Sequence, residues 1–238
     1  MKITCLHLGK APYRETYDLQ KRLVEHVGLH PDDAYMIFVE HSPQVITKGR
    51  RTEDANIVAP TEMLKRMGVD VVEIERGGDV TWHGPGQLVA YPIFRLQAKK
   101  QPLHAYVAAL EEAIIDTLDE LGIESYRSEG KTGVWTDSGK IAAIGVAAAR
   151  RVVWHGLALN VTTDMQGFSL IVPCGLVGNT VTSIERLLPE CPAMESVESI
   201  LARHLCPLLE FDSVEHVEAD TTFKPEAETE VEQEIQTK

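Results

Sequence analysis

A cluster of four glycines between two β-like runs constrains the fold of this 238-residue chain more than any other feature. The segment RGGDVTWHGPGQLVAYP, residues 76–92, contains Gly77, Gly78, Gly84 and Gly86. Glycine adopts positive φ angles without steric cost and lets the main chain approach a ligand closely. The segment therefore predicts a pair of tight loops in a sheet protein. It matches neither the G-x-x-x-x-G-K-[ST] loop nor a G-x-G-x-x-G turn that opens a helix, so nucleotide binding through such loops is not supported.

Helical and strand-like patterns alternate irregularly along the rest of the chain. The clearest helix spans Leu103–Leu121, because apolar residues recur three and four positions apart and Gly122 follows. Helices are also expected at 17–27, 61–67, 184–188 and 197–209, and strands at 34–40, 69–74, 88–94, 133–136, 141–149 and 152–161. The last two strands are joined by Arg150 and Arg151, which suggests a hairpin. Without a regular βαβ alternation, the pattern predicts an α+β (mixed α/β) domain over residues 1–209.

The negative charge is concentrated at the C-terminus. Residues 210–238 contain ten acidic residues and two lysines, a net charge of −8 out of −13 for the whole chain. A segment of this composition buries too little apolar surface to offset its chain entropy. We therefore predict that residues 210–238 are an acidic, disordered tail.

Composition also narrows the partners and the compartment. With 23 Lys+Arg against 36 Asp+Glu there is no basic excess, so a nucleic-acid partner is disfavoured. No uninterrupted apolar run approaches the roughly 18 residues of a membrane span, so no membrane association is expected. The four cysteines, at 5, 174, 191 and 206, form neither a disulfide framework nor a C-x-x-C pair. Reduced thiols favour a cytoplasmic protein.

The glycine-rich segment closely resembles the signature of the octanoyltransferases, or lipoyl(octanoyl) transferases, of lipoate biosynthesis. The shared pattern is Arg-Gly-Gly, then Thr-aromatic-His-Gly-Pro-Gly-Gln, then Tyr-Pro, and here it occupies residues 76–78, 81–87 and 91–92. Residues 40–51, 139–145, 155–160 and 173–175 are similar to further blocks of the family, and the resemblance covers about residues 8–188. It implies a catalytic domain similar to the biotin and lipoate protein ligases, with mixed sheets flanked by helices.

The resemblance implies an acyltransferase that acts in protein lipoylation. Such an enzyme moves an octanoyl group from acyl carrier protein to the ε-amino group of a specific lysine on a lipoyl domain. The implied acceptors are the lipoyl domains of lipoate-dependent dehydrogenase complexes and the glycine cleavage protein. Because amide formation from a thioester is downhill, neither ATP nor a cofactor is expected.

Two residues are candidates for the chemistry, Cys174 and Lys140. Cys174 lies between Pro173 and Gly175 on an expected loop, and Lys140 begins the small, apolar strand IAAIGVAAA. The family pattern implies that they form a catalytic Cys/Lys dyad with a cysteine thioester intermediate. A nearby cation favours the thiolate, which is the nucleophilic form of cysteine.

The resemblance also implies an acyl-binding pocket built from three segments. They are Arg76, Gly77, Gly78, Asp79, Val80, Thr81, Trp82 and His83; Ala143, Ile144 and Gly145; and Gly156, Leu157 and Ala158. Their small side chains suit a slot for a flexible eight-carbon chain. His83 or His155 pairing with Cys174 is an alternative, although a loop histidine more often supports the main chain. No spacing typical of a metal site accompanies Cys174, and no metal is expected.

Two other kinds of protein remain open at this point. An ATP-dependent lipoate or biotin protein ligase shares a lysine strand of the Lys140 type, but it does not need Cys174 and its adenylate loops differ. A non-catalytic domain that binds acyl carrier protein or lipoyl domains leaves the Cys174–Lys140 pair without a purpose. Loss of transfer on replacing Cys174, and activity without ATP, distinguish the transferase from both.

Overall fold

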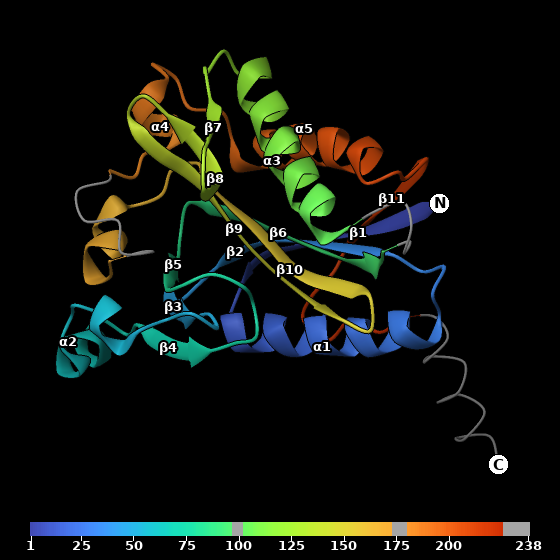
Figure 1. The fold of residues 1–238 in the computed structure, drawn as a ribbon, viewed down its shortest axis with the longest axis horizontal. Coiled ribbons are helices and arrows are strands. Elements are labelled where there is room, and N and C mark those ends of the chain that lie inside the picture. The colour runs from blue at the N-terminus through green and yellow to red at the C-terminus, as the bar shows by residue number, and fades with distance from the viewer. Residues whose placement is uncertain (97–101, 173–179, 226–238) are drawn as a thin grey trace.

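The computed structural model describes residues 1–96, 102–172 and 180–225, which form two sheets and their covering helices (Figure 1). The strands are β1 (Lys2–Ala11), β2 (Tyr35–His41), β3 (Val45–Lys48), β4 (Asp70–Glu73), β5 (Thr81–His83), β6 (Gln87–Arg95), β7 (Tyr126–Ser128), β8 (Lys131–Thr136), β9 (Gly139–Ala149), β10 (Val152–Asn160) and β11 (Ser213–Glu218). The α-helices are α1 (Tyr13–Leu29), α2 (Thr61–Arg66), α3 (Leu103–Glu120), α4 (Ile184–Leu187) and α5 (Met194–Leu208). Two short 3-10 helices cover Asp54–Asn56 and Met165–Leu170.

The large sheet has the strand order β11-β1-β2-β6-β10-β9-β8-β7. β1 pairs in parallel with both β11 and β2, whereas every pairing from β2 through β7 is antiparallel. The smaller sheet, β4-β3-β5, pairs β3 in parallel with β4 and antiparallel with β5. Both sheets combine the two orientations, as the sequence predicted.

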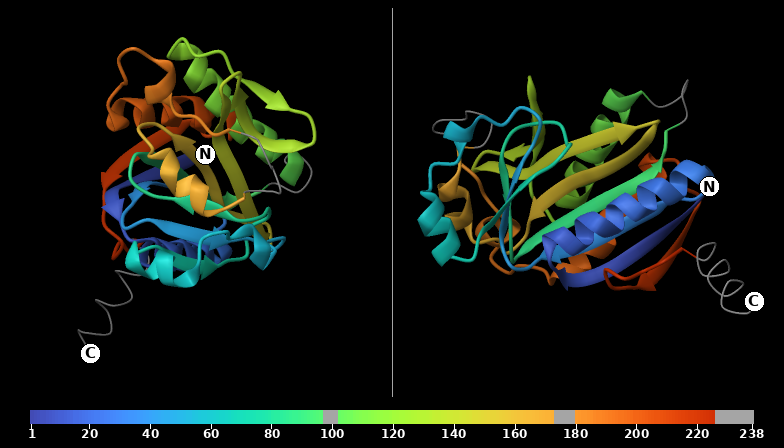
Figure 2. Two further views of the ribbon diagram at one scale, coloured as in Figure 1. Left: turned by 90° about the vertical axis from the view of Figure 1, so that its left-hand side faces the viewer. Right: turned by 90° about the horizontal axis from the view of Figure 1, so that it is seen from below.

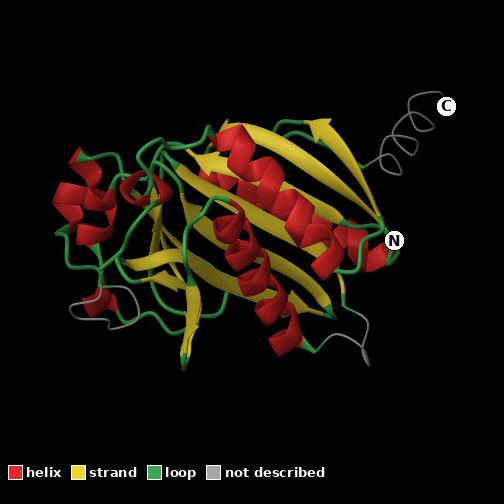
Figure 3. Ribbon diagram, turned by 90° about the horizontal axis from the view of Figure 1, so that it is seen from above, coloured by secondary structure: helices red, strands yellow, loops and turns green. Residues whose placement is uncertain are grey.

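Helices cover both faces of the large sheet. α3 and α5 lie on one face, as Figure 3 shows from above, and their apolar residues, such as Leu110 and Leu201, pack with Phe38 and Leu157 of the strands. α1 runs across the other face, which the right panel of Figure 2 shows from below. Here Leu19 and Leu23 pack against Ile37 and other strand residues. Two apolar clusters, one on each side, therefore stabilise the sheet.

The expected elements up to Leu209 are present with small shifts at their ends. The hairpin between β9 and β10 is confirmed, and its turn residues Arg150 and Arg151 both have positive φ angles, 48° and 75°. A two-residue turn of type I′ requires positive φ at both central residues, and its twist matches the twist of the two strands that it joins. No helix within residues 1–96, 102–172 and 180–225 combines the length and apolar character needed to cross a bilayer.

The prediction that disorder begins at Glu210 is wrong for the first part of that segment. Phe211 is buried, and Ser213–Glu218 forms β11, which pairs in parallel with β1 over six residue pairs. The backbone ladder and the buried ring stabilise a segment whose side chains are mostly exposed and include several acidic residues. Residues 226–238 lie outside the described residues, so an acidic, disordered end there stays a prediction.

Two truncations test the role of β11. A chain that ends at Leu209 loses Phe211 and the β1 pairing, and we expect its free energy of unfolding to fall by about 3 kcal/mol or more, because a buried phenylalanine alone is worth about that much. A chain that ends at Pro225 keeps both and serves as the control. Urea denaturation measures the difference, and equal midpoints for the two chains would contradict this role.

Candidate active site

The three segments predicted to form the acyl pocket meet at the middle of β9. Gly145, Ile144 and Ala143 lie directly opposite Gly156, Leu157 and Ala158 in the antiparallel β9–β10 pairing. The main-chain N–H of Gly77 donates a hydrogen bond of 2.8 Å to the carbonyl oxygen of Val146. This stretch of β9 is half-buried although it lies inside the sheet. The predicted grouping of the segments is therefore present, while their role in binding stays a prediction.

Arg76 lies buried between the glycine-rich loop and the strands beside it. Its Nη2 donates to the carbonyl and hydroxyl oxygens of Thr47, both at 2.9 Å, and its Nη1 donates to the carbonyl of Gly77 at 3.1 Å. A Cβ atom at Gly145 would lie 2.8 Å from Arg76 Cδ, and one at Gly49 would lie 2.6 Å from the Gly78 carbonyl oxygen. Glycine at these two positions thus lets the loop lie close to its neighbours.

Other residues of the glycine-rich segment are held by contacts with neighbouring parts of the chain. Asp79 accepts hydrogen bonds from Asn56 Nδ2 at 2.7 Å and from the Val80 N–H at 2.6 Å. Val80 and Trp82 are buried in the apolar cluster of the smaller sheet, and Trp82 Nε1 donates to Gln44 Oε1 at 3.1 Å. In this structure both side chains pack in a core.

Lys140 lies at the start of β9, where main chain and side chain both have defined partners. Its Nζ donates a hydrogen bond of 2.9 Å to the carbonyl oxygen of Thr132, and lies 5.4 Å from the centre of the Trp135 ring. Its main-chain N–H donates to the carbonyl of Thr180, and its carbonyl accepts from the N–H of Thr182, both at 3.0 Å.

Cys174 lies outside the described residues. The chain on both sides of residues 173–179 is described. On one side, the N–H of Val172 donates to the carbonyl of Asn56 at 2.8 Å, and Asn56 also holds Asp79 of the glycine-rich loop. On the other side, Thr180 and Thr182 are bonded to Lys140. The segment that contains Cys174 therefore connects these two parts of the predicted site.

Three buried histidines, His41, His83 and His155, lie near helix α1 on one side of the candidate site. Burial is the main cause that lowers the pKa of His41 to about 3, of His83 to about 4 and of His155 to about 3. The positive charge of Arg76 further lowers the pKa of His83 and His155. All three are neutral at pH 7. The ring of His83 stacks on Tyr13, with centroids 6.1 Å apart, and that of His155 stacks on Tyr17 at 6.0 Å.

His83 takes part in a buried polar network that connects to the strands. Its Nδ1 is 2.7 Å from Gln87 Oε1, so Nδ1 carries the proton and donates. Gln87 Nε2 donates to Asn160 Oδ1, and Asn160 Nδ2 donates to the Thr182 carbonyl, both at 2.9 Å. The network ends beside Lys140, which favours a supporting role for His83.

Sequence reasoning assigned no role to Thr47, Asn56, Asn160 or Trp135. Thr47 and Asn160 stand inside blocks that resemble the family, which was the available signal. Asn56 and Trp135 carry no comparable signal, because each meets its partner only through the folded chain.

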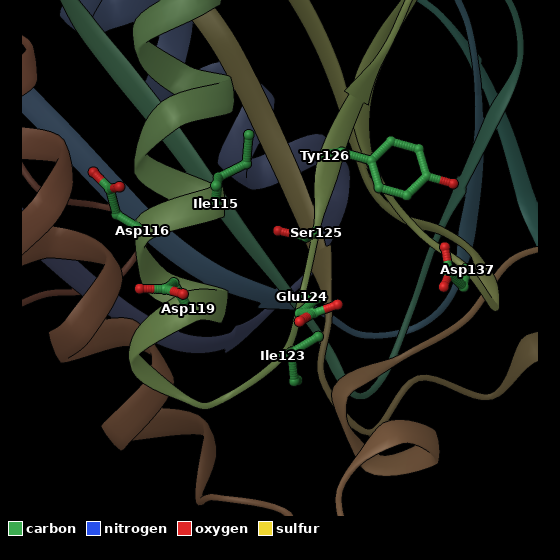
Figure 4. A pocket seen from close by; sticks show the side chains of 8 residues that line it. All are labelled: Ile115, Asp116, Asp119, Ile123, Glu124, Ser125, Tyr126 and Asp137. Carbon is green, nitrogen blue, oxygen red and sulfur yellow. The ribbon is translucent and has the colours of Figure 1, made fainter.

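A separate cavity of about 400 Å³ opens between α3 and β7 (Figure 4). Its polar lining is acidic, with Asp116, Asp119, Glu124 and Asp137, and it includes none of the predicted site residues. Within the described parts of the chain, no three His, Cys, Asp or Glu side chains are grouped so as to hold a metal ion.

Comparison with known proteins identifies the class of protein. The family described as "Lipoyl protein ligase A/B catalytic domain" matches residues 12–206 of this chain. Lipoate-protein ligase A bound with ATP has the same fold, with a TM-score of 0.73 at 17% identity over 100% of this chain and 95% of that one. A bipartite lipoate protein ligase from Thermoplasma acidophilum gives a TM-score of 0.73 at 17% identity, covering 93% and 90%. The predicted ligase-like fold is confirmed.

The sequence relatives are more specific than the fold. An octanoyltransferase of Syntrophobacter fumaroxidans is 45% identical over 213 residues, 89% of this chain and 92% of the relative. That of Syntrophotalea carbinolica is 42% identical over 202 residues, 85% and 92%. The chain belongs to the octanoyltransferase family, a family of acyltransferases, as its motifs predicted.

The buried histidines predict acid sensitivity. Their pKa values lie below the ordinary value of about 6.5, so between about pH 6.5 and pH 4 the unfolded chain binds more protons than the folded one. Stability is therefore present near pH 7 and is lost as the pH falls through this window, by about 1.4 kcal/mol per pH unit for each histidine that takes up a proton only on unfolding. Urea denaturation from pH 7 to pH 4 measures the slope.

His155→Phe keeps an aromatic ring and removes one titrating group, so we expect a shallower slope. The exposed His30→Phe is the matched control for replacing a histidine with phenylalanine. Equal slopes in His155→Phe and the wild type would contradict the assignment for His155.

Proposed function

We propose that the protein transfers an octanoyl group from octanoyl-acyl carrier protein to the ε-amino group of a specific lysine on a lipoyl domain, in lipoate biosynthesis. Family membership supports the octanoyl transfer. The observation that carries the proposal at the site is the pairing of Lys140 with Thr180 and Thr182, directly after the segment that contains Cys174. This pairing supports a dyad of Cys174 and Lys140.

The proposed reaction has two acyl transfers. The Cys174 thiolate attacks the carbonyl carbon of the octanoyl thioester, the carbon–sulfur bond to the donor breaks, and the donor thiol leaves with a proton from the Lys140 ammonium. The acceptor amine then attacks the Cys174 thioester, an amide forms, and Cys174 leaves as thiolate. Lys140 takes the proton that the amine releases, which restores the starting state.

The acyl chain is proposed to lie where Arg76–His83, Ala143–Gly145 and Gly156–Ala158 converge. Main-chain N–H groups of such a glycine-rich loop can stabilise the oxyanion of each tetrahedral intermediate. The reaction consumes no ATP, because one thioester replaces another before the amide forms. No cofactor or metal has a role in these steps.

Positive charge beside the glycine-rich loop supports an acidic partner. The exposed Arg50 and Arg51 donate main-chain hydrogen bonds to the carbonyls of Arg76 and Gly78, both at 3.1 Å. Lys48, the third basic residue of this group, is already paired with Asp54 and Glu73, with Nζ 2.7 Å from each carboxylate. Acyl carrier proteins and lipoyl domains are typically acidic, so Arg50 and Arg51 are suited to attract them. The lipoyl domains of dehydrogenase complexes and of the glycine cleavage protein are the proposed acceptors, and the cytoplasm is the proposed compartment.

Replacing Cys174 tests the reaction class. In an ATP-free assay with octanoyl-acyl carrier protein and a lipoyl domain, we expect Cys174→Ala to lower the transfer rate by about a thousandfold or more, because the nucleophile is lost. Cys191→Ala is the matched control and keeps the wild-type rate, since burial raises the pKa of the Cys191 thiol and leaves it a poor nucleophile. Full activity in Cys174→Ala would contradict the thioester intermediate, and a requirement for ATP would favour a ligase.

Charge reversal tests the docking surface. We expect Arg50→Glu/Arg51→Glu to raise KM for octanoyl-acyl carrier protein about tenfold or more at low salt, with a smaller effect at high salt where charges are screened. Arg150→Glu, in the exposed turn between β9 and β10, is the control. An unchanged KM at low salt would exclude this surface.

A further inference from the structure

We propose that Trp135, together with Thr132 and Gly133 of the same strand, positions Lys140 and stabilises its charged ammonium. The inference rests on the proposed role of Lys140, and it adds the residues that place Nζ for proton transfer. Trp135 is a positioning residue, because it acts through Lys140.

The register of three strands places Lys140 on an aromatic row. Lys140 of β9 lies opposite Trp135 of β8, and Trp135 lies opposite Tyr126 of β7. Cross-strand partners have side chains on the same face of a sheet. The Lys140 Nζ accordingly lies 5.4 Å from the Trp135 ring centre, within the range of a cation–π interaction.

The main chain of β8 fixes the ammonium from another direction. Nζ donates a hydrogen bond of 2.9 Å to the Thr132 carbonyl. A Cβ atom at Gly133 would lie 2.6 Å from Lys140 Cε and 3.0 Å from Nζ, and Gly133 has a φ angle of +124°, which side chains rarely adopt. The glycine thus leaves the space that the lysine side chain occupies.

The chemistry of Trp135 indicates why an indole stands at this position. Only 6% of the residue is exposed, and Nε1 has no hydrogen-bond acceptor in the described structure. Burying a donor without an acceptor costs stability, and phenylalanine or leucine would avoid that cost. Tryptophan also has the ring face that attracts a cation most strongly. The contact of the ring face with Lys140 therefore explains a tryptophan at position 135, where packing alone would favour phenylalanine or leucine.

Both contacts favour the charged form of Lys140. A carbonyl oxygen accepts from the ammonium, and the ring face attracts a positive charge but not a neutral amine. Among the described residues, Lys131 is a second cation on this ring, with its Nζ 5.2 Å from the ring centre and its side chain exposed. A charged Lys140 is the proton donor that the first acyl transfer needs.

The test measures Lys140 itself, without reference to transfer. The full-length protein is labelled with trace acetic anhydride across a pH series, and the acetylation of Lys140 is quantified by peptide mass spectrometry. In Trp135→Leu, which keeps an apolar side chain and removes the ring, we expect Lys140 to be acetylated about three- to tenfold faster near neutral pH, because more of it is the free amine. Trp135→Phe keeps a weaker ring face and should fall between Leu and wild type.

Lys131→Gln is the matched control, since it removes the other cation over the ring and should leave Lys140 acetylation close to the wild-type rate. Thermal melting establishes that each variant is folded, and labelling of the other lysines normalises the reagent. A Lys140 profile in Trp135→Leu that is unchanged, or moved to higher pH, would overturn the positioning role.

The two proposals can fail separately. If Lys140→Ala keeps full transfer activity, the catalytic role of Lys140 fails, while faster labelling in Trp135→Leu still supports its positioning by Trp135. If Lys140→Ala loses activity but Trp135→Leu leaves the labelling unchanged, the catalytic role stands and the positioning fails.

Discussion

The main-chain hydrogen bonds of β9 hold the parts of the predicted site in one place. β9 pairs with β10 along most of its length, accepts the Gly77 N–H through Val146, and binds Thr180 and Thr182 through Lys140. β9 therefore carries residues 143–145 and contacts residues 156–158, the glycine-rich loop and the chain that follows the Cys174 segment. These contacts use the main chain, so they depend on the sheet register and on the small residues along it. A change in that register would separate all of them together.

The charged groups near β9, Arg76 and Lys140, have different surroundings. Arg76 is buried and held by oxygen atoms of Thr47 and Gly77, and its charge helps to keep His83 and His155 neutral. Lys140 is half-buried, next to a carbonyl and an aromatic ring. At pH 7 the neutral His83 and His155 are not proton donors, so the proposed mechanism assigns that role to Lys140. This arrangement fits a site in which the proposed proton donor and acceptor is a lysine.

The elements with strong periodicity could be predicted from the sequence. The helix at Leu103–Leu121 appears where the pattern placed it, because its apolar spacing is a local property. The hairpin on either side of Arg150 and Arg151 was found from its two β-like runs and not from its turn, since arginine does not favour the positive φ angles that both turn residues adopt. β1 was missed because His7, Gly9 and Lys10 interrupt its apolar run, although the strand is stabilised by pairing on both sides. β11 was missed for a related reason, since its side chains are mostly exposed and include two glutamates, which conceals a strand that a single parallel ladder holds in place.

The same difference between local and long-range signals applies to the candidate site. Its sequence blocks could be identified because they match specific residues of the family pattern, and the structure brings three of these blocks together. The surroundings of Lys140 could not be found, because Trp135 meets it only through the antiparallel register of β8 and β9. Likewise, Asn56 meets Asp79 across 23 positions of the chain. Contacts of this kind follow from the fold, and no local pattern carries them.

The proposed reaction requires the acyl group to pass through Cys174. Intact-mass analysis after mixing the protein with octanoyl-acyl carrier protein detects this intermediate. We expect a gain of one octanoyl group, located on Cys174 by peptide mapping, absent in Cys174→Ala and lost when a lipoyl domain is added. Octanoylation of the lipoyl domain while Cys174 never carries the acyl group, under rapid quenching, would contradict it.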